Sequence, residues 1–308
     1  MTPRQLAMLL SLAALWGASF LFMRVAVPSL GPVVLADARV AIAGVALLGY
    51  AAVIRALPEL RSRWRDYLLL GTVNAALPFT LLAAAELEIE ASLAAVLNAM
   101  APLCGAVVGA VWLGHRVTHP AKAGLVLGVA GVALVVGLSP FTIDLPFVLA
   151  VLACLAAAFG YGIGANLVRA RFADEPPLAL AIGQQLAAAV VLLPLIPVVP
   201  LRSTPDALDI ACLLALALAS TSVAYLLYFR LLAELGATGG MTVIFVVPVF
   251  GVLWGALFLG ETIDLATVLG GAVILVSVYL ITRFPARAPE RRVGGPTAGS
   301  APVTPSAG

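Results

Sequence analysis

The sequence has little charge. Only 10% of its 308 residues are Asp, Glu, Lys or Arg, against roughly 25% in an ordinary soluble domain, and 63% are hydrophobic. With a mean hydropathy of +1.12, a water-soluble globule is excluded, because so few charged side chains cannot cover the surface of a chain of this length. The net charge of +2 is too small to indicate nucleic acid as a partner.

Cysteine and histidine are also scarce, and neither is placed for chemistry. Cys104, Cys154 and Cys212 each lie inside an apolar run without metal or disulfide spacing, so we expect small buried hydrophobes. His115 and His119 lie in a basic loop and have no carboxylate beside them. There is no glycine-rich phosphate loop. The sequence therefore predicts no metal site, no cofactor and no catalytic residue.

What the chain has instead is long apolar runs. They cover about 6–23, 33–54, 67–85, 91–113, 121–138, 145–168, 178–199, 209–229, 237–259 and 263–282. A helix that crosses a bilayer needs about 20 apolar residues, whereas barrel strands alternate in short segments. We read the first run as a retained helix rather than a cleaved signal peptide, because no small-x-small cleavage site follows it. The sequence thus predicts an all-α integral membrane protein with ten transmembrane helices.

Basic residues predict the orientation of these helices. If the N-terminus is cytoplasmic, almost all loop arginines and the one loop lysine face the cytoplasm, and Arg202 alone faces outside. The inside residues are Arg4, Arg55, Arg61, Arg63, Arg65, Arg116, Lys122, Arg169, Arg171, Arg230, Arg283, Arg287, Arg291 and Arg292. This asymmetry predicts that both termini are cytoplasmic. Residues 285–308, rich in Pro, Gly, Ser and Ala, are expected to form a disordered cytoplasmic tail.

An internal repeat is the most informative pattern. The run that begins Pro102-Leu103-Cys104-Gly105 matches the run that begins Pro248-Val249-Phe250-Gly251, and the same offset pairs Gly109 with Gly255, Gly114 with Gly260 and Gly124 with Gly270. The repeat predicts two halves, 1–139 and 140–284, with five helices each. Because five is odd, the second half must enter the membrane inverted.

The loop charges agree with an inverted repeat. The loop that holds His115 and Arg116 is basic, while its counterpart with Glu261 and Asp264 is acidic, as expected if the two face opposite compartments. Two inverted-topology repeats are a transporter architecture, in which similar halves expose one central site to each side in turn.

Three motifs carry a family resemblance. Trp16-Gly17-Ala18-Ser19-Phe20, Asp37-Ala38-Arg39 and Leu259-Gly260-Glu261 resemble the first-helix, second-helix and ninth-helix motifs of the drug/metabolite transporter superfamily, EamA type. The resemblance spans 1–284. The chain departs from the pattern in two places: His115 stands where the first half would carry the matching glutamate, and Asp37 is an unusual charge.

The resemblance implies a permease of the bacterial inner membrane, often an exporter of amino acids or other small metabolites. We therefore predict a secondary transporter that moves a small metabolite, an amino acid or a related amphipathic compound, outward by alternating access. The alternative from another class is a multipass membrane enzyme acting on a lipid-linked substrate. Such an enzyme would need clustered His, Asp, Glu or Cys at one depth. The expected partners are the substrate and the lipid bilayer.

Charged residues in the apolar runs or directly after them are candidates for a gate, since charge inside a membrane is costly and usually functional. Arg24, Asp37, Arg39 and Glu86 are all expected in the outer third. We hypothesise two pairs, Asp37 with Arg24 and Arg39 with Glu86, which break as the carrier opens. The alternative for Arg24 and Glu86 is snorkelling to the headgroups. No fixed charge is expected at the midplane.

Uncharged polar and aromatic residues deeper in the runs are candidates for binding substrate, because lipid offers no hydrogen bonds. The resemblance implies a central cavity built by helices 1, 3, 4, 6, 8 and 9. It favours the following residues over the adjacent pair Gln184 and Gln185. They are Trp16, Asn74, Phe79, Asn98, Tyr161, Ser222 and Tyr225.

Paired helix breakers and small residues complete the predictions. Pro102 and Pro248 occupy matching places in helices 4 and 9, and we expect hinge or gating duty from them. Gly124 and Gly128 form a small-residue stripe on helix 5. This stripe is either the contact face of a homodimer or a site of close packing within the chain.

The inverted arrangement makes a prediction about compartments. Reporter domains fused at the residue-140 junction and at the chain's tail should report opposite compartments, because five spans separate the two positions. Activity of both fusions in the same compartment would contradict the inverted repeat.

Overall fold

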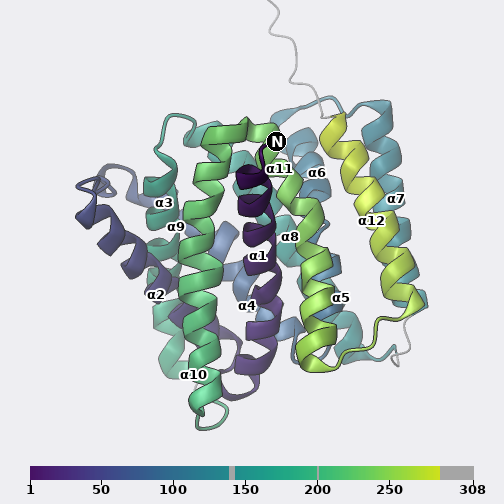
Figure 1. Ribbon diagram of the computed structural model, residues 1–308, viewed down its shortest axis with the longest axis horizontal. Coiled ribbons are helices and arrows are strands. Elements are labelled where there is room, and N and C mark those ends of the chain that lie inside the picture. The colour runs from purple at the N-terminus through teal and green to yellow at the C-terminus, as the bar shows by residue number, and fades with distance from the viewer. Residues whose placement is uncertain (139–142, 200, 285–308) are drawn as a thin grey trace, which may run out of the picture.

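The computed structural model describes residues 1–138, 143–199 and 201–284, and this part of the chain is a bundle of helices (Figure 1). The described residues form ten helical segments long and apolar enough to cross a membrane, and no β-strand runs among them. The predicted ten-span, all-α membrane fold is thereby confirmed. The predicted tail, 285–308, lies outside the described residues.

The first half holds five spans. They are α1 (Pro3–Leu30), α2 (Pro32–Val53), α3 with α4 (Trp64–Gly71 and Leu77–Ala85), α5 with α6 (Ala91–Asn98 and Ala101–Leu113) and α7 (His119–Gly137). The second half holds α8 (Leu145–Arg171), α9 (Pro177–Leu192), α10 (Ala207–Leu214), α11 (Ala224–Trp254) and α12 (Leu265–Arg283). Short 3₁₀ segments flank these helices at Arg61–Arg63 and Leu193–Val198. Helix α11 contains Gly236 in a non-helical conformation, φ 68° and ψ −175°, where one span ends and the chain passes toward the next.

Local signals explain where helices begin. Asp144 and Asp264 accept hydrogen bonds from backbone N–H groups three residues later, at 2.9 and 2.6 Å, and so cap α8 and α12. Thr2 forms a capping box with Gln5 at the start of α1. These caps satisfy backbone N–H groups that have no partner within the helix. They therefore define where these helices begin.

Helices α3 and α4 are joined by a π-helical stretch at Thr72–Ala76, α10 and α11 by one at Ala215–Val223, and a third follows α11 at Gly255–Leu259. A π turn inserts an extra residue and shifts the register of the side chains beyond it. The first two stretches carry or adjoin the polar residues of the site described below.

The bundle has two opposite faces where the helices end. Helix α1 begins and α12 ends on one face, at the top of Figure 1, and we call it the terminal face. The opposite face, with the loops 86–90 and 260–264, is the distal face. The largest cluster of buried side chains joins the distal parts of α1 and α4 to α5 and α8. This cluster also reaches Ala121 of α7 and Ile281 of α12 near the terminal face.

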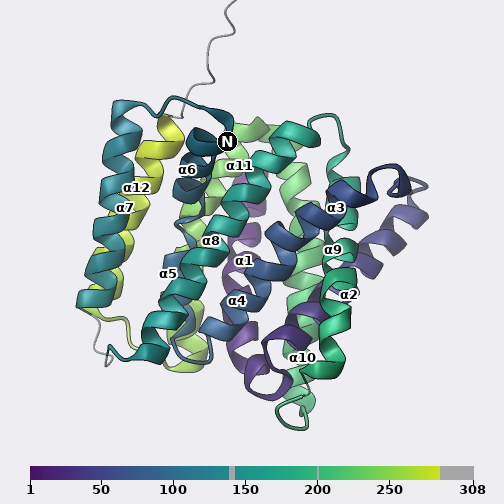
Figure 2. The ribbon, with the colours of Figure 1, turned by 180° about the vertical axis from the view of Figure 1, so that it is seen from behind.

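The outer helices form two flanks. Helices α7 and α12 pack together at one side, and α2, α3 and α9 lie at the other, with α1, α4, α8 and α11 between them (Figures 1 and 2). A Cβ on Gly124 would lie 2.9 Å from the backbone oxygen of Ser277 in α12, and one on Gly131 would lie 3.1 Å from that of Gly270. A Cβ on Gly128 would collide with the side chain of Leu103 in α6, so α12 and α6 together fill the glycine stripe of α7. Of the two readings of this stripe, the structure favours packing within the chain.

The repeat is visible in matched backbone details. Gly114 and Gly260 have nearly equal left-handed conformations, with φ of 67° and 68°. The next residue in each half, His115 or Glu261, donates its N–H to the glycine carbonyl six positions earlier, at 3.2 Å in both cases. Glycine is favoured at such helix ends because it has no Cβ to clash.

The matched prolines lie in different surroundings. Pro102 is in the first turn of α6, just after a break that separates α5 from α6, whereas Pro248 lies in the helix interior of the part of α11 that follows the kink at Gly236. A proline at a helix start removes no hydrogen bond, while one inside a helix does. Equivalent segments of the two halves thus have different shapes in this conformation. Whether the prolines act as hinges stays a prediction.

Close packing of α1 against α11 predicts the effect of one methyl group. A Cβ on Gly17 would lie 2.7 Å from the Cβ of Phe250, so Gly17→Ala should destabilise the bundle by about 1–3 kcal/mol through overpacking, measured by thermal unfolding in detergent. Gly49→Ala is the matched control, because nothing lies within 4 Å of its Cβ. It should leave stability unchanged or raise it by up to ~1 kcal/mol. Equal stability of the two variants would contradict this packing.

Candidate functional site

A chain of hydrogen bonds crosses the middle of the bundle. Asn74 donates from Nδ2 to Oε1 of Gln184 at 2.8 Å, and Gln184 donates from Nε2 to the hydroxyl of Tyr225 at 2.7 Å. The three residues come from the Thr72–Ala76 stretch, α9 and α11. Gly164 on α8 leaves the room that the Asn74 side chain occupies. Two side-chain amides and a hydroxyl thus join three spans, and lipid could not satisfy the hydrogen bonds of these groups.

Arg39 of α2 lies beside this chain and is 5% exposed. Its Nε donates to Oγ1 of Thr221 at 3.0 Å, and its guanidinium carbon lies 3.8 Å from the ring centroid of Phe79. Its Nη1 is 3.7 Å from the sulfur of Met23. The structure shows no ion pair of Arg39 with a described carboxylate within 4.0 Å. The cation is held by a π face, a hydroxyl and a thioether instead.

Thr221 sits midway along the span Ala207–Gly236. The guanidinium of Arg39 therefore reaches the middle of the bundle, whereas the sequence reasoning placed Arg39 in the outer third and no charge at the midplane. The long side chain explains the difference, since an arginine head lies several ångströms from its own backbone.

Two tyrosines complete the surroundings of the cation. The rings of Phe79 and Tyr161 meet edge to face, with centroids 6.4 Å apart, and Tyr161 and Tyr225 are both near enough to Arg39 to interact with its charge. We call the group the central cluster. Its members are Arg39, Asn74, Phe79, Tyr161, Gln184, Thr221 and Tyr225.

Four of the seven predicted substrate-binding residues lie in the central cluster: Asn74, Phe79, Tyr161 and Tyr225. The other three do not. Trp16 contacts Tyr228 with the rings tilted and their centroids 5.3 Å apart, and Ser222 donates to the backbone of Ala43 at 3.4 Å. Asn98, at the end of α5, has a buried Oδ1 without a hydrogen-bond partner.

Sequence reasoning missed two members of the central cluster. It ranked Gln184 below other residues and chose Ser222 within a run that also holds Thr221. Adjacent residues of a helix point about 100° apart, so the composition of such a run does not tell which member faces inward. A π-helical stretch at Ala215–Val223 shifts the register further. Gln185, beside Gln184, is fully buried and leaves both of its polar atoms unpartnered.

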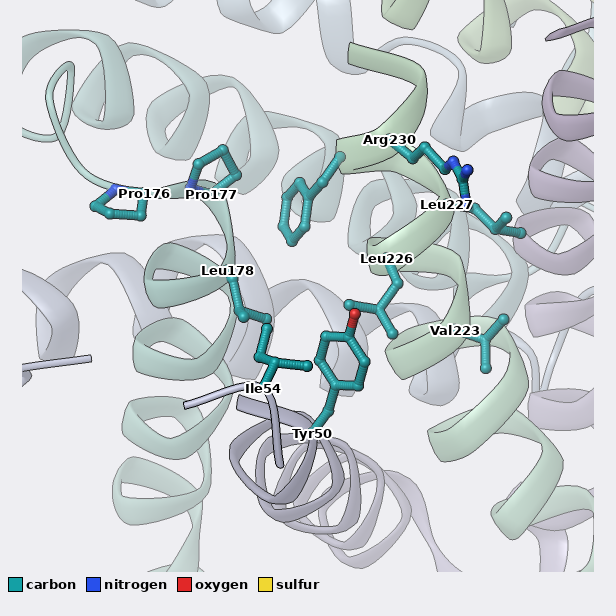
Figure 3. A pocket seen from close by; sticks show the side chains of 10 residues that line it. Tyr50, Ile54, Pro176, Pro177, Leu178, Val223, Leu226, Leu227 and Arg230 are labelled. Carbon is teal, nitrogen blue, oxygen red and sulfur yellow. The ribbon is translucent and has the colours of Figure 1, made fainter. Parts of the chain in front are cut away.

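A cavity of about 470 Å³ lies on the terminal side of the central cluster, between α2, α9 and α11. Figure 3 shows Tyr50 of α2, Leu178 of α9 and Leu226 of α11 around an open space. Its lining is apolar apart from Arg230 and the Tyr50 hydroxyl. Phe229, also in the lining, contacts Tyr225 with ring centroids 5.8 Å apart. The cavity therefore borders the central cluster.

A carboxylate at a helix start joins the two halves on the distal side of the bundle. Glu261 accepts hydrogen bonds from the backbone N–H groups of Ala91 at 2.8 Å and Ser92 at 2.9 Å. Gly255 makes room for this side chain, since a Cβ there would collide with it. The N-terminus of α5 carries partial positive charge and free N–H groups, so it attracts an anion. We call this contact, which joins the two halves, the distal latch.

The two ion pairs predicted for the gate are not formed. Arg24 donates from Nη1 to the backbone carbonyl of Glu86, not to Asp37. Neither carboxyl oxygen of Glu86 has a hydrogen-bond partner, and Oδ1 of Asp37 has none either. Arg24 is instead drawn to the carbonyl end of α4, where the helix dipole is negative, and Arg39 to the central cluster.

No cluster of three or more potential metal ligands is found among the described residues. Taken together, ten membrane spans, a polar cluster at mid-depth, a cavity on one side of it and a latch between repeats on the other are the build of a membrane transporter.

Both halves of the sequence match a known protein family. The EamA-like transporter family model matches residues 4–137 and, separately, 148–283. The chain belongs to the EamA-like transporter family, and the resemblance seen in its motifs is confirmed. Members of this family are transporters, so the alternative of a multipass membrane enzyme was wrong.

Relatives match along nearly the whole chain. An uncharacterized transporter of Archaeoglobus fulgidus is 26% identical, over 87% of this chain and 95% of its own length. A probable terminal-alkyne amino-acid exporter of Streptantibioticus cattleyicolor is 28% identical, over 87% and 90%. A chloroplastic WAT1-related protein of Arabidopsis thaliana is 28% identical, over 88% and 67%. One crystal structure, 19% identical, superposes over 92% of this chain and 98% of its own with a TM-score of 0.64, which supports the fold alone.

Removing the distal latch should affect both stability and access to the distal face. Glu261→Ala leaves two N–H groups of α5 without their acceptor, so we expect a loss of about 1–2 kcal/mol in stability and a looser distal face. The measurement is the labelling rate of Ser92→Cys, a position 4% exposed, with a membrane-impermeant maleimide. The rate should rise when Glu261→Ala is added and stay unchanged with Glu88→Ala, an exposed control. An unchanged rate in Glu261→Ala would show that the latch does not hold the face closed.

Proposed function

We propose that this transporter exports an amino acid, or a similar small metabolite with a free carboxylate, and that the central cluster binds it. The observation that carries the proposal is Arg39. It is a buried cation at mid-depth with no described carboxylate in ion-pair distance. A buried charge without a counterion is unfavourable by several kcal/mol, so a substrate that brings a carboxylate is favoured at this point.

The neighbours of Arg39 suit the rest of such a molecule. A guanidinium binds a carboxylate through paired N–H donors. The Asn74–Gln184–Tyr225 chain offers groups that can both donate and accept hydrogen bonds to an amino group, while Phe79 and Tyr161 provide apolar surface for a side chain. An amphipathic metabolite matches this mixture better than a sugar or an inorganic ion.

The cavity and the latch support a route of transport. The cavity lies on the terminal side and is lined by Phe229, which contacts Tyr225, while the distal latch joins the two halves at the other end. A substrate would load from the terminal side, and release would follow when the latch parts. In this scheme the hinges lie near Pro102 and Pro248, whose surroundings differ between the halves.

Charge supports the direction. The loops of the terminal face carry nearly all the loop arginines, and basic loops stay in the cytoplasm. We therefore propose cytoplasmic termini, a location in the bacterial inner membrane and loading from the cytoplasm. The name of the Streptantibioticus relative as an amino-acid exporter agrees with this direction and with the substrate class.

The test uses purified protein in proteoliposomes loaded with an unlabelled amino-acid mixture. Counterflow of a uniformly ¹⁴C-labelled protein hydrolysate should accumulate label, and chromatography of the retained label should identify the substrate. Arg39→Gln should reduce uptake about ten- to hundredfold, because a hydrogen bond to a charged group contributes about 1.5–3 kcal/mol. Arg55→Gln, at an exposed position of the terminal face, is the matched control and should transport normally.

The carboxylate requirement has its own readout in the same vesicles. The amide of the identified amino acid, which keeps the side chain and amino group but lacks the negative charge, should fail to compete with the labelled substrate. Competition by the amide as strong as by the free acid would contradict the role of Arg39, even if the chain transports amino acids.

A further inference from the structure

Glu86 is the most deeply buried carboxylate that the described residues hold. It follows α4 directly, is 0% exposed, and donates its N–H to Leu82 in the manner of a helix end. Both of its carboxyl oxygens are buried and have no hydrogen-bond partner. A buried carboxylate that is ionised and unpaired is unfavourable by several kcal/mol, so this arrangement is stable only if the group carries a proton.

The charged and titratable groups around Glu86 do not offset a negative charge. Arg24 of α1 places Nη1 on the backbone carbonyl of Glu86, and Arg39 of α2 is engaged by Phe79 and Thr221. Cys154 of α8 and the carboxylate of Glu261, beyond α11, also lie within electrostatic reach.

No ion pair within 4.0 Å joins Glu86 to either arginine, and Glu261 repels a charge on it. Glu86 lies outside the spans themselves, between the one that ends at Ala85 and the one that begins at Ala91. Burial raises the pKa of Glu86, and the positive charge of Arg24 lowers it by less. The pKa therefore lies well above the usual range of a glutamate.

The site lies behind the distal latch. Glu261 holds the N-terminus of α5, and α5 begins five residues after Glu86. Parting of the latch would admit water to this short connection. A hydrated carboxyl group returns toward its ordinary pKa near 4.3, and Arg24 is at hand to stabilise the resulting charge.

We propose that Glu86 is a proton-binding site that couples the distal gate to protons. With the latch closed, the carboxyl group is neutral. With the latch open, its O–H bond breaks, the proton passes to water at the distal face, and the carboxylate is left facing Arg24. Closing requires a proton to return to the same oxygen. The proposal rests on the transporter function, but it needs no knowledge of the substrate.

The protonation of Glu86 determines how pH shifts the balance between the closed and the open gate. A group that is protonated only in the closed state stabilises that state at low pH and loses this effect as the pH rises toward its raised pKa. Higher pH at the distal face should therefore favour the open gate. Glu90, whose pKa is raised by burial and then by Glu261 and Asp264, titrates in the same region, so variants of Glu86 itself are required.

The first test reads the proton directly. Infrared difference spectroscopy of the full chain in lipid nanodiscs should show the carbonyl band of a protonated carboxyl group at neutral pH. That band should be lost in Glu86→Gln and kept in Glu88→Gln, an exposed carboxylate two residues away. Glu86→Asp should keep a shifted band, which separates loss of the group from loss of the fold. If the spectrum of Glu86→Gln keeps every such band of the wild type, or if the wild type shows none, the proposal is overturned.

The second test reads the gate. Nitroxide labels at Glu88→Cys and Thr262→Cys, both exposed positions on the distal face, report the separation of the two halves by double electron–electron resonance. The three native cysteines are buried and are replaced by alanine. Raising the pH should shift the distances toward longer values. The shift should vanish in Glu86→Gln, which mimics the neutral form, and persist in Glu59→Gln, at an exposed position of the terminal face.

An unchanged pH response in Glu86→Gln would overturn the proposal and assign the response to other groups such as Glu90. Both tests are made without an amino acid. A failure of the substrate assignment to Arg39 therefore leaves their outcome intact, and a failure of Glu86 leaves that assignment intact.

Discussion

The constraint behind this structure is that lipid accepts and donates no hydrogen bonds. Every polar group within a span must find its partner inside the protein or remain unsatisfied at considerable cost. Most do find one: Asn74, Gln184 and Tyr225 satisfy one another, and Asn166 of α8 donates to the backbone of Gly105 at 2.9 Å. The groups left over are therefore informative. Arg39 has no described carboxylate within 4.0 Å, and the carboxyl group of Glu86, just beyond the end of a span, has no hydrogen-bond partner. We propose that a substrate carboxylate binds at the first and a proton at the second.

The two halves of the chain share a design but not a conformation. Gly114 and Gly260 end their helices with the same dihedral angles and the same following hydrogen bond. Yet the residue after each glycine differs, and so does its partner: Glu261 latches the start of α5, while His115 has no such carboxylate to offer. One end of the bundle is held by a charged latch between the halves, and the cavity opens toward the other. Two similar units in unequal shapes are what alternating access requires.

Much of the fold was predictable, because the requirements of a bilayer are simple. Run length and apolar character located all ten spans, and a repeated pattern of proline and glycine predicted two related halves. Helix interruptions were not predictable to the same degree. The break between α5 and α6 and the π-helical stretches at Thr72–Ala76 and Ala215–Val223 depend on how neighbouring helices pack, which no local pattern encodes.

The candidate site was predictable only in part. Residue type and depth pointed to Asn74, Phe79, Tyr161 and Tyr225, since aromatic and amide groups in mid-span are rare. Register decided the rest: Thr221 accepts a hydrogen bond from the side chain of Arg39, while its neighbour Ser222 donates to the backbone carbonyl of Ala43. The gate pairs failed for another reason. Opposite charges on neighbouring helices suggested ion pairs, but a helix end and a π face were better placed to receive the arginines.

Alternating access requires that the central cluster be reached from each face in turn. The most direct measurement is the reactivity of Thr221→Cys, beside Arg39 and 1% exposed, toward a membrane-impermeant methanethiosulfonate in a chain without its native cysteines. The reagent is added from one face only, in vesicles of each orientation. We expect modification from either face, at different rates, and protection by a transported amino acid. Modification from a single face alone would contradict it.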